Sequence, residues 1–318
     1  MTFRKYSVAI LLVAALAMTA TTASAEKLRI GKSSASGFTF FPLDVGIDQH
    51  IFEKNGLDLE SIELGGSAKL HQAMIADGID IGLGAGTDIS FLVKGAPEMA
   101  VGAVALSPAL FGLVALTDSP IQKPSDIKGK RVGISTAGSL TEWLVLQLQK
   151  NEKLRPGDVT RIAVGSDTTP QLAALQTKQI DAVMTAAALG LNLAQQGRGK
   201  LVIPASQIVG QFVMNALYAT NNVLAKRPDE VRRFTKAWYE SVAYMNAHKA
   251  ETVKVAVNIT HFSPEVQSEQ YDQVMPSLSV DGKFPPAAVK AVEESFVDLG
   301  ILDKNPDMSK YLTEKYLK

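Results

Sequence analysis

The chain has 318 residues, with 32 lysines and arginines against 32 aspartates and glutamates, four histidines and no cysteine. The absence of cysteine excludes disulfide bonds, and it excludes a lipid anchor attached to a cysteine behind a signal peptide. The balanced charge, without a basic stretch that contains interleaved aromatic residues, argues against nucleic-acid binding, and the scattered histidines lack the spacing of metal ligands.

The first 25 residues have the pattern of a secretory signal peptide. Arg4 and Lys5 precede an apolar stretch at 8–18, and the small residues Ala23-Ser24-Ala25 precede Glu26. The apolar stretch is shorter than the roughly 20 residues that a membrane helix needs. We therefore expect cleavage after residue 25 and a freely diffusing protein in the periplasm.

Short β-like runs alternate with helical patterns along residues 26–220, which predicts an α/β fold with largely parallel sheets. Strands are expected at 27–32, 57–64, 79–86, 98–106, 111–118, 132–134, 158–165, 180–185, 200–204 and 210–220. Helices are expected between them at 42–54, 67–78, 87–94, from 140 onward, 168–178 and 186–196. From Pro228 the pattern is helical, with a long amphipathic helix to Met245 and further helices at 250–259, 264–274, 286–298 and 308–317.

Two segments repeat one helix–turn–strand pattern. MIADGIDIGLG at 74–84 and LQTKQIDAVMT at 175–185 both place an Ile-Asp pair between an expected helix and an expected strand. The repetition predicts two similarly built lobes rather than one long sheet.

The stretch VGISTAGSLTEWLV at 132–145 joins a buried strand to a helix through a cluster of hydroxyls and glycine. Such a helix N-terminus presents unpaired backbone N–H groups and the positive end of the helix dipole. The stretch is therefore suited to holding an anion.

Four segments together resemble a known family: 41–60, with FEKNGLDLE at its end, 65–86 (GGSAKLHQAMIADGIDIGLGAG), 125–139 (SDIKGKRVGISTAGS) and 174–184 (ALQTKQIDAVM). They are similar to the nitrate, taurine and aliphatic-sulfonate group of periplasmic solute-binding proteins of ABC transporters, the NMT1/THI5-like family. The same superfamily includes binders of pyrimidine precursors.

The resemblance implies a two-lobed periplasmic binding protein fold of type II, in which each lobe is a mixed, mainly parallel sheet flanked by helices. Lobe one would comprise 26–107 with 211–318, lobe two would comprise 108–210, and hinges are expected at 106–111 and 206–212. We expect a monomer that binds a small anionic solute between its lobes and delivers it to permease subunits at the inner membrane. No catalytic residue, cofactor or metal ion is expected.

The site is expected at the carboxyl ends of the strands, where open α/β sheets bind ligands. Loops rich in hydroxyls, glycines and amides follow the expected strands at 33–41, 65–67, 85–88, 107–109 and 135–139. The predicted solute-binding residues are Ser36, Gly37, Phe38, Phe40, Gly65, Gly66, Ser67, Gly86, Thr87, Ser107, Ser135, Thr136, Gly138, Ser139, Thr185 and Asn215.

Many of these residues also fit structural roles. Gly65 and Gly66 suit a turn with positive φ as well as a close approach to solute. Helix caps or first-turn positions are alternatives for Ser67, Thr87 and Ser139. The phenylalanines of the first loop fit either a wall of the site or the core, whereas Trp143 is expected in the core and Asp88 as a helix cap.

The three phenylalanines at 38–41 favour an organic anion with an apolar body, such as taurine, another alkanesulfonate or a carboxylate. Nitrate, a pyrimidine or thiamine precursor, and a solute-sensing role remain alternatives. An oxidoreductase is disfavoured because GLGAG at 82–86 has the wrong glycine spacing and Gly102 stands where an acidic residue is expected. A serine hydrolase is disfavoured because the segment 133–138 is one residue longer than G-x-S-x-G.

Overall fold

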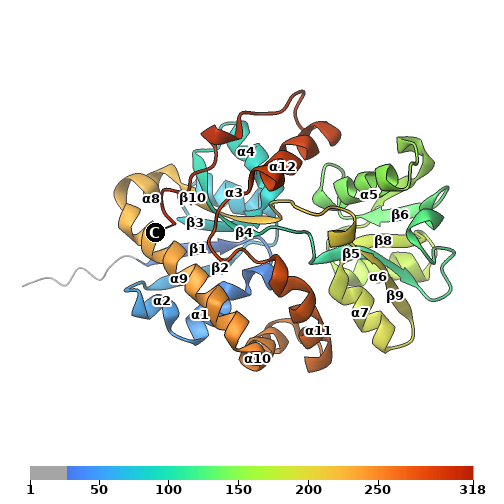
Figure 1. Ribbon diagram of the computed structural model, residues 1–318, viewed down its shortest axis with the longest axis horizontal. Coiled ribbons are helices and arrows are strands. Elements are labelled where there is room, and N and C mark those ends of the chain that lie inside the picture. Colours follow the sequence, from blue (N-terminus) through green and yellow to red (C-terminus); the bar gives the residue numbers. More distant parts are fainter. Residues whose placement is uncertain (1–26, 318) are drawn as a thin grey trace, which may run out of the picture.

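The computed structural model describes residues 27–317 and contains two five-stranded sheets that lie side by side (Figure 1). The strand order is β2-β1-β3-β10-β4 in the first sheet and β7-β6-β8-β5-β9 in the second. Helices flank both sheets, which confirms the predicted α/β fold class. The predicted signal peptide, 1–25, lies outside the described residues.

The two sheets have the same topology. The strands of the first sheet are β1 (Leu28–Lys32), β2 (Leu59–Glu63), β3 (Ile81–Ala85), β4 (Glu98–Ala105) and β10 (Asn215–Thr220). Those of the second are β5 (Phe111–Leu116), β6 (Arg131–Ile134), β7 (Thr160–Ala163), β8 (Ala182–Ala186) and β9 (Gly199–Pro204). In each sheet three neighbouring strands are parallel, and the fourth, β10 or β5, runs antiparallel to both of its neighbours. We call the first sheet with its helices lobe one and the second lobe two.

Helices join the parallel strands and make up most of the C-terminal part. They are α1 (Phe41–Asp48), α2 (Ile51–Lys54), α3 (Ser67–Ile75), α4 (Ile89–Val93), α5 (Leu140–Asn151), α6 (Thr168–Gln176), α7 (Ala187–Gln195), α8 (Asn221–Lys226), α9 (Pro228–Ala247), α10 (Lys249–Thr260), α11 (Pro264–Val274) and α12 (Pro286–Asp298). No described helix is both long and apolar enough to cross a membrane.

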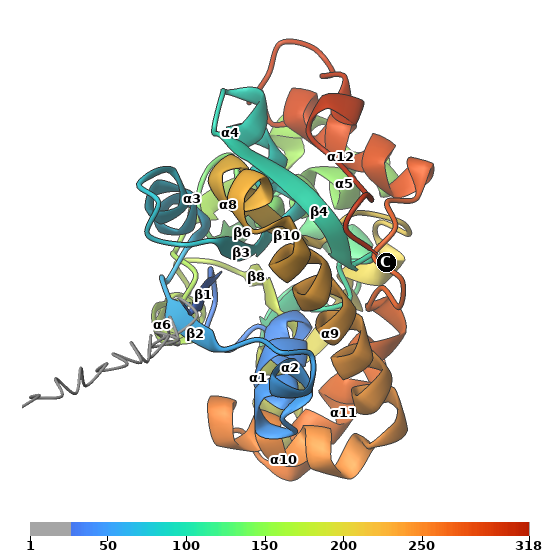
Figure 2. The same cartoon turned by 90° about the vertical axis from the view of Figure 1, so that its left-hand side faces the viewer.

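Alternating residues of β1 face opposite helical layers. A Cβ on Gly31 would lie 2.6 Å from the Leu70 side chain of α3, whereas the next side chain, Lys32, pairs with Asp44 of α1. The period of two in a strand requires this alternation. Figure 2 shows α1, α2, α9 and α10 gathered on one side of the first sheet, with α3 on the other.

The carboxyl ends of the parallel strands in both sheets point toward the same junction. β4 leads directly into β5 through residues 106–110, and β9 leads into β10 through residues 205–214. A chain of five residues spans at most about 18 Å. The end of β4 and the start of β5 therefore lie close together, and the strand-end edges of the two lobes meet at these crossovers.

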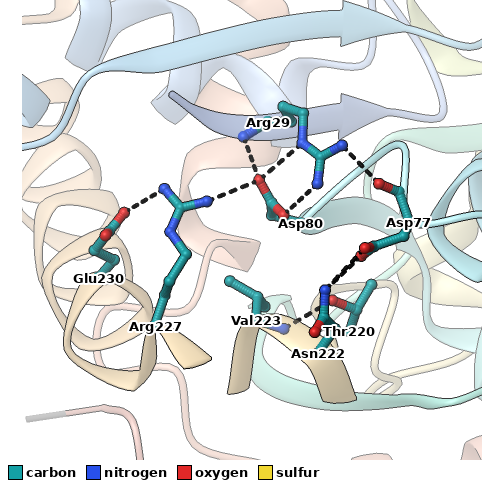
Figure 3. Close-up of polar contacts among 8 residues, drawn as sticks. All are labelled: Arg29, Asp77, Asp80, Thr220, Asn222, Val223, Arg227 and Glu230. Carbon is teal, nitrogen blue, oxygen red and sulfur yellow. Dashed lines mark hydrogen bonds and ion pairs between the residues drawn. The ribbon is translucent and has the colours of Figure 1, made fainter. Parts of the chain in front are cut away.

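A network of ion pairs lies at the amino ends of the parallel strands of lobe one, away from the crossovers (Figure 3). Arg29 of β1 binds Asp80, which precedes β3, through its backbone N–H at 2.8 Å and two guanidinium contacts. Arg227 also contacts Asp80, at 3.4 Å, and pairs with Glu230 of α9. This network fixes the start of the long helix to the first sheet.

Lobe two repeats the same pair at the equivalent positions. The backbone N–H of Arg131 donates to Asp181 Oδ2 at 2.9 Å, and its guanidinium binds both carboxylate oxygens. Asp80 and Asp181 are the aspartates of the two Ile-Asp pairs in the sequence repeat. The predicted helix–turn–strand repeat is thereby confirmed as α3–β3 and α6–β8.

Two predicted helices differ from the structure. The helix expected at 42–54 is divided into α1 and α2, because His50 adopts a left-handed conformation with φ of 56°. The prediction of a helix at 308–317 is wrong, since only a single turn forms at Met308–Lys310. The following residues instead bond the free edge of β4: Thr313 N–H donates to the Ala100 carbonyl at 2.9 Å, and Ala100 N–H donates to the Tyr311 carbonyl at 2.9 Å.

Candidate functional site

The strand ends of lobe one bring three predicted loops together. Leu64 N–H donates to the Lys32 carbonyl at 3.0 Å, and Ser33 N–H donates to the Leu83 carbonyl at 3.1 Å. The segments 33–37, 65–67 and 86–88 therefore lie at one edge of the first sheet, in the strand order β2-β1-β3. Asn215, the first residue of β10, pairs with Ala85 and Ala105 at the same strand ends. Ser107 follows Ala105 by two residues and so lies beside them.

The strand ends of lobe two bring together the segment 135–139 and the end of β7. Val164 N–H donates to the Ile134 carbonyl at 2.9 Å, and Gly165 N–H donates to the Ser135 carbonyl at 3.1 Å. Thr185 lies one strand further along, in β8, with its hydroxyl 2.6 Å from Gln171 Oε1. Each lobe thus contributes one cluster of predicted residues.

The two serine hydroxyls of the segment 135–139 both bond to Thr141, in the first turn of α5. Ser135 N–H donates to Thr141 Oγ1 at 2.8 Å, and the hydroxyls of Ser135 and Ser139 each lie 2.9 Å from that same oxygen. Ser139 is the N-cap of α5, because its Oγ accepts the Glu142 N–H at 3.3 Å. Thr136 is exposed, and its hydroxyl has no hydrogen-bond partner among the described residues.

A carboxylate of the chain lies at the N-terminus of α5, where the sequence predicted an anion. Gly138 N–H donates to Glu142 Oε2 at 2.7 Å, and Arg161 of β7 donates to Glu142 Oε1 at 2.9 Å. A negative side chain in the first turn of a helix is stabilised by the helix dipole. Glu142 therefore neutralises part of the positive field that an anionic solute would use.

The aromatic residues of the first loop point into lobe one. Phe38 and Phe40 are 0% and 2% exposed, and Phe38 contacts Phe41 and Tyr271 with ring centroids 5.1 and 6.3 Å apart. Their positions match core packing, the alternative considered from the sequence. The exposed residue of this loop is Ser36, followed by the buried Gly37.

Two different structural features account for the glycines at the strand ends. Gly65 and Gly66 adopt φ of 64° and 144°, and nothing lies within 4 Å of an added Cβ. Gly86 has no such torsion, but an added Cβ would lie 1.6 Å from the Val213 carbonyl oxygen. Backbone conformation therefore explains Gly65 and Gly66, whereas Gly86 is required by the close approach of the second crossover.

Asn215 is occupied by internal hydrogen bonds. Its Oδ1 accepts the Thr39 hydroxyl at 2.9 Å, and its Nδ2 donates to the Gly84 carbonyl at 3.2 Å. The side chain is buried. It therefore ties the first loop to β3 and β10 at the strand-end edge.

Lys32, the last residue of β1, and Arg131, the first residue of β6, are both paired with carboxylates. Lys32 is 1% exposed and its Nζ lies 3.0 Å from each carboxylate oxygen of Asp44. Burial raises the pKa of Asp44, and the charge and hydrogen bonds of Lys32 oppose that shift. Arg131 binds Asp181 at the far edge of the second sheet, so it takes no part at the strand ends.

A buried charge cluster behind the segment 85–88 was not predicted from the sequence. His71 of α3 lies between Glu98, with Nδ1 and Oε2 2.7 Å apart, and Asp88, with Nε2 and Oδ2 3.3 Å apart. Burial lowers the pKa of His71, but hydrogen bonds and charges of Asp88 and Glu98 outweigh it and raise the pKa to about 9. The three residues come from separate elements, so no local motif signals them.

The expectation that Asp88 is a cap is confirmed, since its Oδ2 accepts the Ala85 N–H at 2.8 Å.

Two larger cavities lie away from most predicted residues. One, of about 710 Å³, lies between α10 and α11 and is lined by Lys249, Val253, Glu265, Glu269 and Asp272. The other, of about 360 Å³, lies between α5 and α12 and includes Glu142, Arg161 and Asp298. Among the described residues, no group of three His, Asp or Glu side chains is arranged to hold a metal ion.

The family model described as "NMT1/THI5 like" matches residues 38–252 of the chain. The chain belongs to this family. The match covers both sets of strand ends, so the family pattern includes most of the candidate site.

Known proteins resemble this chain in sequence or in structure, at low sequence identity. A "Putative thiamine biosynthesis protein" of Haemophilus influenzae is 26% identical over 211 residues, which is 65% of this chain and 65% of that protein, just under two thirds of its length. The alkanesulfonate-binding protein SsuA from Xanthomonas axonopodis pv. citri, bound to MOPS, is 17% identical with a TM-score of 0.75 over 90% of this chain and 98% of that chain. The desulfurization enzyme DSZB is 14% identical with a TM-score of 0.68 over 92% and 97% of the two chains. The NMT1/THI5-like chain thus has the periplasmic binding protein fold, which occurs in binding proteins and in an enzyme.

Proposed function

We propose that this protein is the solute-binding component of an ABC importer, and that it holds a small organic anion, a sulfonate or a carboxylate, between its two lobes. The observation that carries the proposal is the meeting of two strand-end edges at the short crossovers 106–110 and 205–214. Both edges present hydroxyls, glycines and helix N-termini, which bind a solute without changing it chemically.

The proposed contacts are the predicted groups that reach the surface of these edges. Ser36 and Thr136 are exposed, while Ser67, Thr87 and Gly138 are half-buried. Gly65 and Gly66 leave open space above the backbone. The buried Phe38, Phe40, Thr185 and Asn215 shape and support the site in this proposal, and Ser107 lies at the first crossover.

A pyrimidine precursor of thiamine is the second candidate solute. It is favoured by Glu142, whose Oε2 takes the Gly138 N–H that an anion would need at the N-terminus of α5, while its Oε1 is paired with Arg161. An amino group that donates a hydrogen bond to this carboxylate fits the position better than an anion. The likeness to a putative thiamine biosynthesis protein supports the same candidate.

A thermal-shift screen tests the proposal. Residues 26–318 are melted with alkanesulfonates, taurine, aliphatic and aromatic carboxylates, nitrate and aminopyrimidines, each over a concentration series. A solute at 100-fold excess over its Kd stabilises the folded state by about 2.7 kcal/mol. A shift with organic anions supports the first candidate, and a shift with aminopyrimidines alone supports the second. Stabilisation by a nucleotide cofactor, with no response to the panel, would overturn both.

A pair of glycine variants tests the location of the site. Gly138 and Gly129 follow and precede β6, have φ of 75° and 73°, and leave the space around an added Cβ empty. Gly138→Phe is expected to abolish the solute-dependent shift, whereas Gly129→Phe carries the same backbone strain at the far edge and preserves it. Equal retention of the shift in both variants would remove the segment 135–139 from the site.

Export and delivery need separate tests. Expression of the full chain in a double-membraned bacterium is expected to yield a monomeric periplasmic protein that begins at Glu26, checked by mass spectrometry and light scattering. Reconstitution with candidate permease and ATPase subunits, followed by uptake of labelled solute, distinguishes transport from a sensing role.

A further inference from the structure

A buried imidazole stands directly behind the β3 strand end. His71 is 1% exposed, and its ring stacks on Phe91 at 4.6 Å and meets the Tyr218 ring edge-on at 5.1 Å. Its two nitrogens contact two different carboxylates, Glu98 Oε2 at 2.7 Å and Asp88 Oδ2 at 3.3 Å. The two aromatic rings and the Glu98 hydrogen bond hold the ring in place, whereas Asp88 contributes its charge, since its contact with Nε2 is an ion pair without hydrogen-bond geometry.

Both backbone groups of Ala85 are held by neighbours of this imidazole. Asp88 Oδ2 accepts the Ala85 N–H at 2.8 Å, and the Tyr218 hydroxyl donates to the Ala85 carbonyl at 2.5 Å. Ala85 is both the last residue of β3 and the first residue of the segment 85–88 at the carboxyl end of that strand. His71 therefore contacts both of the side chains that bond the Ala85 backbone.

The carboxylates depend on His71 for their charge balance. Glu98 is fully buried on the side chain, and its Oε1 has no hydrogen-bond partner among the described residues. A buried carboxylate without a cationic partner is strongly destabilised. Asp88 lies within the segment 85–88, so an uncompensated charge there repels an anion bound at the same edge.

We propose that His71 is a positioning residue for solute binding: its imidazolium, held between Asp88 and Glu98, fixes the segment 85–88 and offsets one of the two carboxylate charges behind it. The proposal rests on the proposed function for its solute. The titratable groups that contact His71 are Asp88 of the turn after β3, Glu98 of β4 and Tyr218 of β10. Burial, with the charges of Asp88 and Glu98, raises the pKa of Tyr218 well above its usual value, so this phenol stays neutral.

His71→Gln is the first test variant, with His50→Gln as its matched control because His50 is exposed and pairs only with the exposed Glu53. Hydrogen exchange of the Ala85 and Gly86 amides, measured by NMR on residues 26–318, needs no solute. We expect exchange of both amides to accelerate at least tenfold in His71→Gln and to stay unchanged in His50→Gln. Unchanged protection in His71→Gln would overturn the positioning role.

Asp88→Asn separates position from charge and serves if His71→Gln fails to fold. The asparagine Oδ1 still accepts the Ala85 N–H, so the exchange protection of that amide is expected to persist. One anionic partner of His71 is lost, so the imidazole resonances are expected to titrate at lower pH than in the unmodified protein. Loss of amide protection without a change in the titration would contradict the proposed division of roles.

The binding readout uses ethanesulfonate, a sulfonate probe whose charge does not change between pH 6 and 10. The Kd for ethanesulfonate is expected to be flat from pH 6 to 8 and to rise at least fivefold by pH 10 as His71 loses its proton. In Asp88→Asn the same rise is expected at lower pH, because one carboxylate that holds the His71 proton is gone. A rise at the same pH in both proteins would overturn the charge role. Failure of ethanesulfonate to bind at any pH would instead contradict the sulfonate assignment, and the exchange and titration results would still decide the role of His71.

Discussion

Trp143 and Asp298 join the two lobes across 155 residues of sequence: the indole Nε1–H donates to Asp298 Oδ2 at 3.1 Å. Gln147 and Lys150 donate to the same oxygen, each at 2.8 Å. All three donors lie on α5 of lobe two, and the acceptor is the last residue of α12. The Trp143 ring also stacks on Phe212 of the second crossover at 4.7 Å. One carboxylate oxygen therefore holds the C-terminal helix of lobe one against the first helix of lobe two.

Replacement of Asp298 by alanine is expected to loosen this junction. The carboxylate is 26% exposed, so loss of its three donors is expected to cost only about 1 kcal/mol of unfolding free energy after allowance for solvent screening. The more sensitive measurement is the solute-free radius of gyration by small-angle X-ray scattering, which is expected to increase as the lobes separate. Asp303→Ala, which removes a carboxylate from an exposed position five residues on, is the control. Identical scattering of Asp298→Ala and the unmodified protein would show that this junction does not limit opening.

The two equivalent Arg–Asp pairs are expected to differ in stability. Asp80 is 4% exposed on its side chain and binds both Arg29 and Arg227, whereas Asp181 is 14% exposed and binds an arginine that is 43% exposed. Removing one partner of a buried pair leaves an uncompensated charge, so Asp80→Ala is expected to cost about 3 kcal/mol. Asp181→Ala is expected to cost clearly less, because solvent screens its partner. Urea unfolding of the two variants checks the order, and a larger loss in Asp181→Ala would contradict it.

The sequence predicted the regular elements where local signals and tertiary packing agree. The helices at 264–274 and 286–298 have the predicted bounds, because each begins with a proline at its first position and has an apolar face. The helix predicted at 308–317 does not form, because the free edge of β4 offers backbone partners that no local pattern reveals. The left-handed His50 similarly divides a helix whose apolar periodicity runs through it.

The positions of the loops at the strand ends were predictable, but the hydrogen-bond partners of their residues were not. Strand order brings the loops after β1, β2, β3 and β6 to the expected edges, because parallel strands end together. Which hydroxyl bonds which neighbour depends on side-chain geometry. Ser139 caps its own helix, and Glu142 takes the Gly138 N–H that seemed available to a solute. His71 and Glu98 are 27 residues apart and meet only through the packing of α3 on the sheet.

Loss of the His71 proton is expected to lower the free energy of unfolding at alkaline pH. The pKa is raised to about 9 in the folded protein, from about 6.5 when the chain is unfolded. The contribution is therefore complete below pH 6.5 and is lost as pH rises through 9. Within this window the unfolding free energy is expected to fall by up to about 1.4 kcal/mol per pH unit. Urea unfolding from pH 6 to 9.5 measures the slope, and His71→Gln is expected to flatten it. Equal slopes in both proteins would mean that His71 is neutral in the folded state.

Gly86 is expected to tolerate no side chain, although its surroundings are those of a predicted binding loop. Its N–H donates to the Met214 carbonyl at 2.9 Å, and the Val213 carbonyl lies where a Cβ would point. Gly86→Ala must therefore displace the second crossover or break the β3–β10 pairing, and is expected to cost more than about 3 kcal/mol. Gly138→Ala meets open space and suffers only its positive φ, at about 1 kcal/mol. Urea unfolding compares the two, and equal losses would mean that the crossover shifts freely at Val213. A large loss confined to Gly86→Ala would identify this contact as a rigid point between the strand end and the crossover.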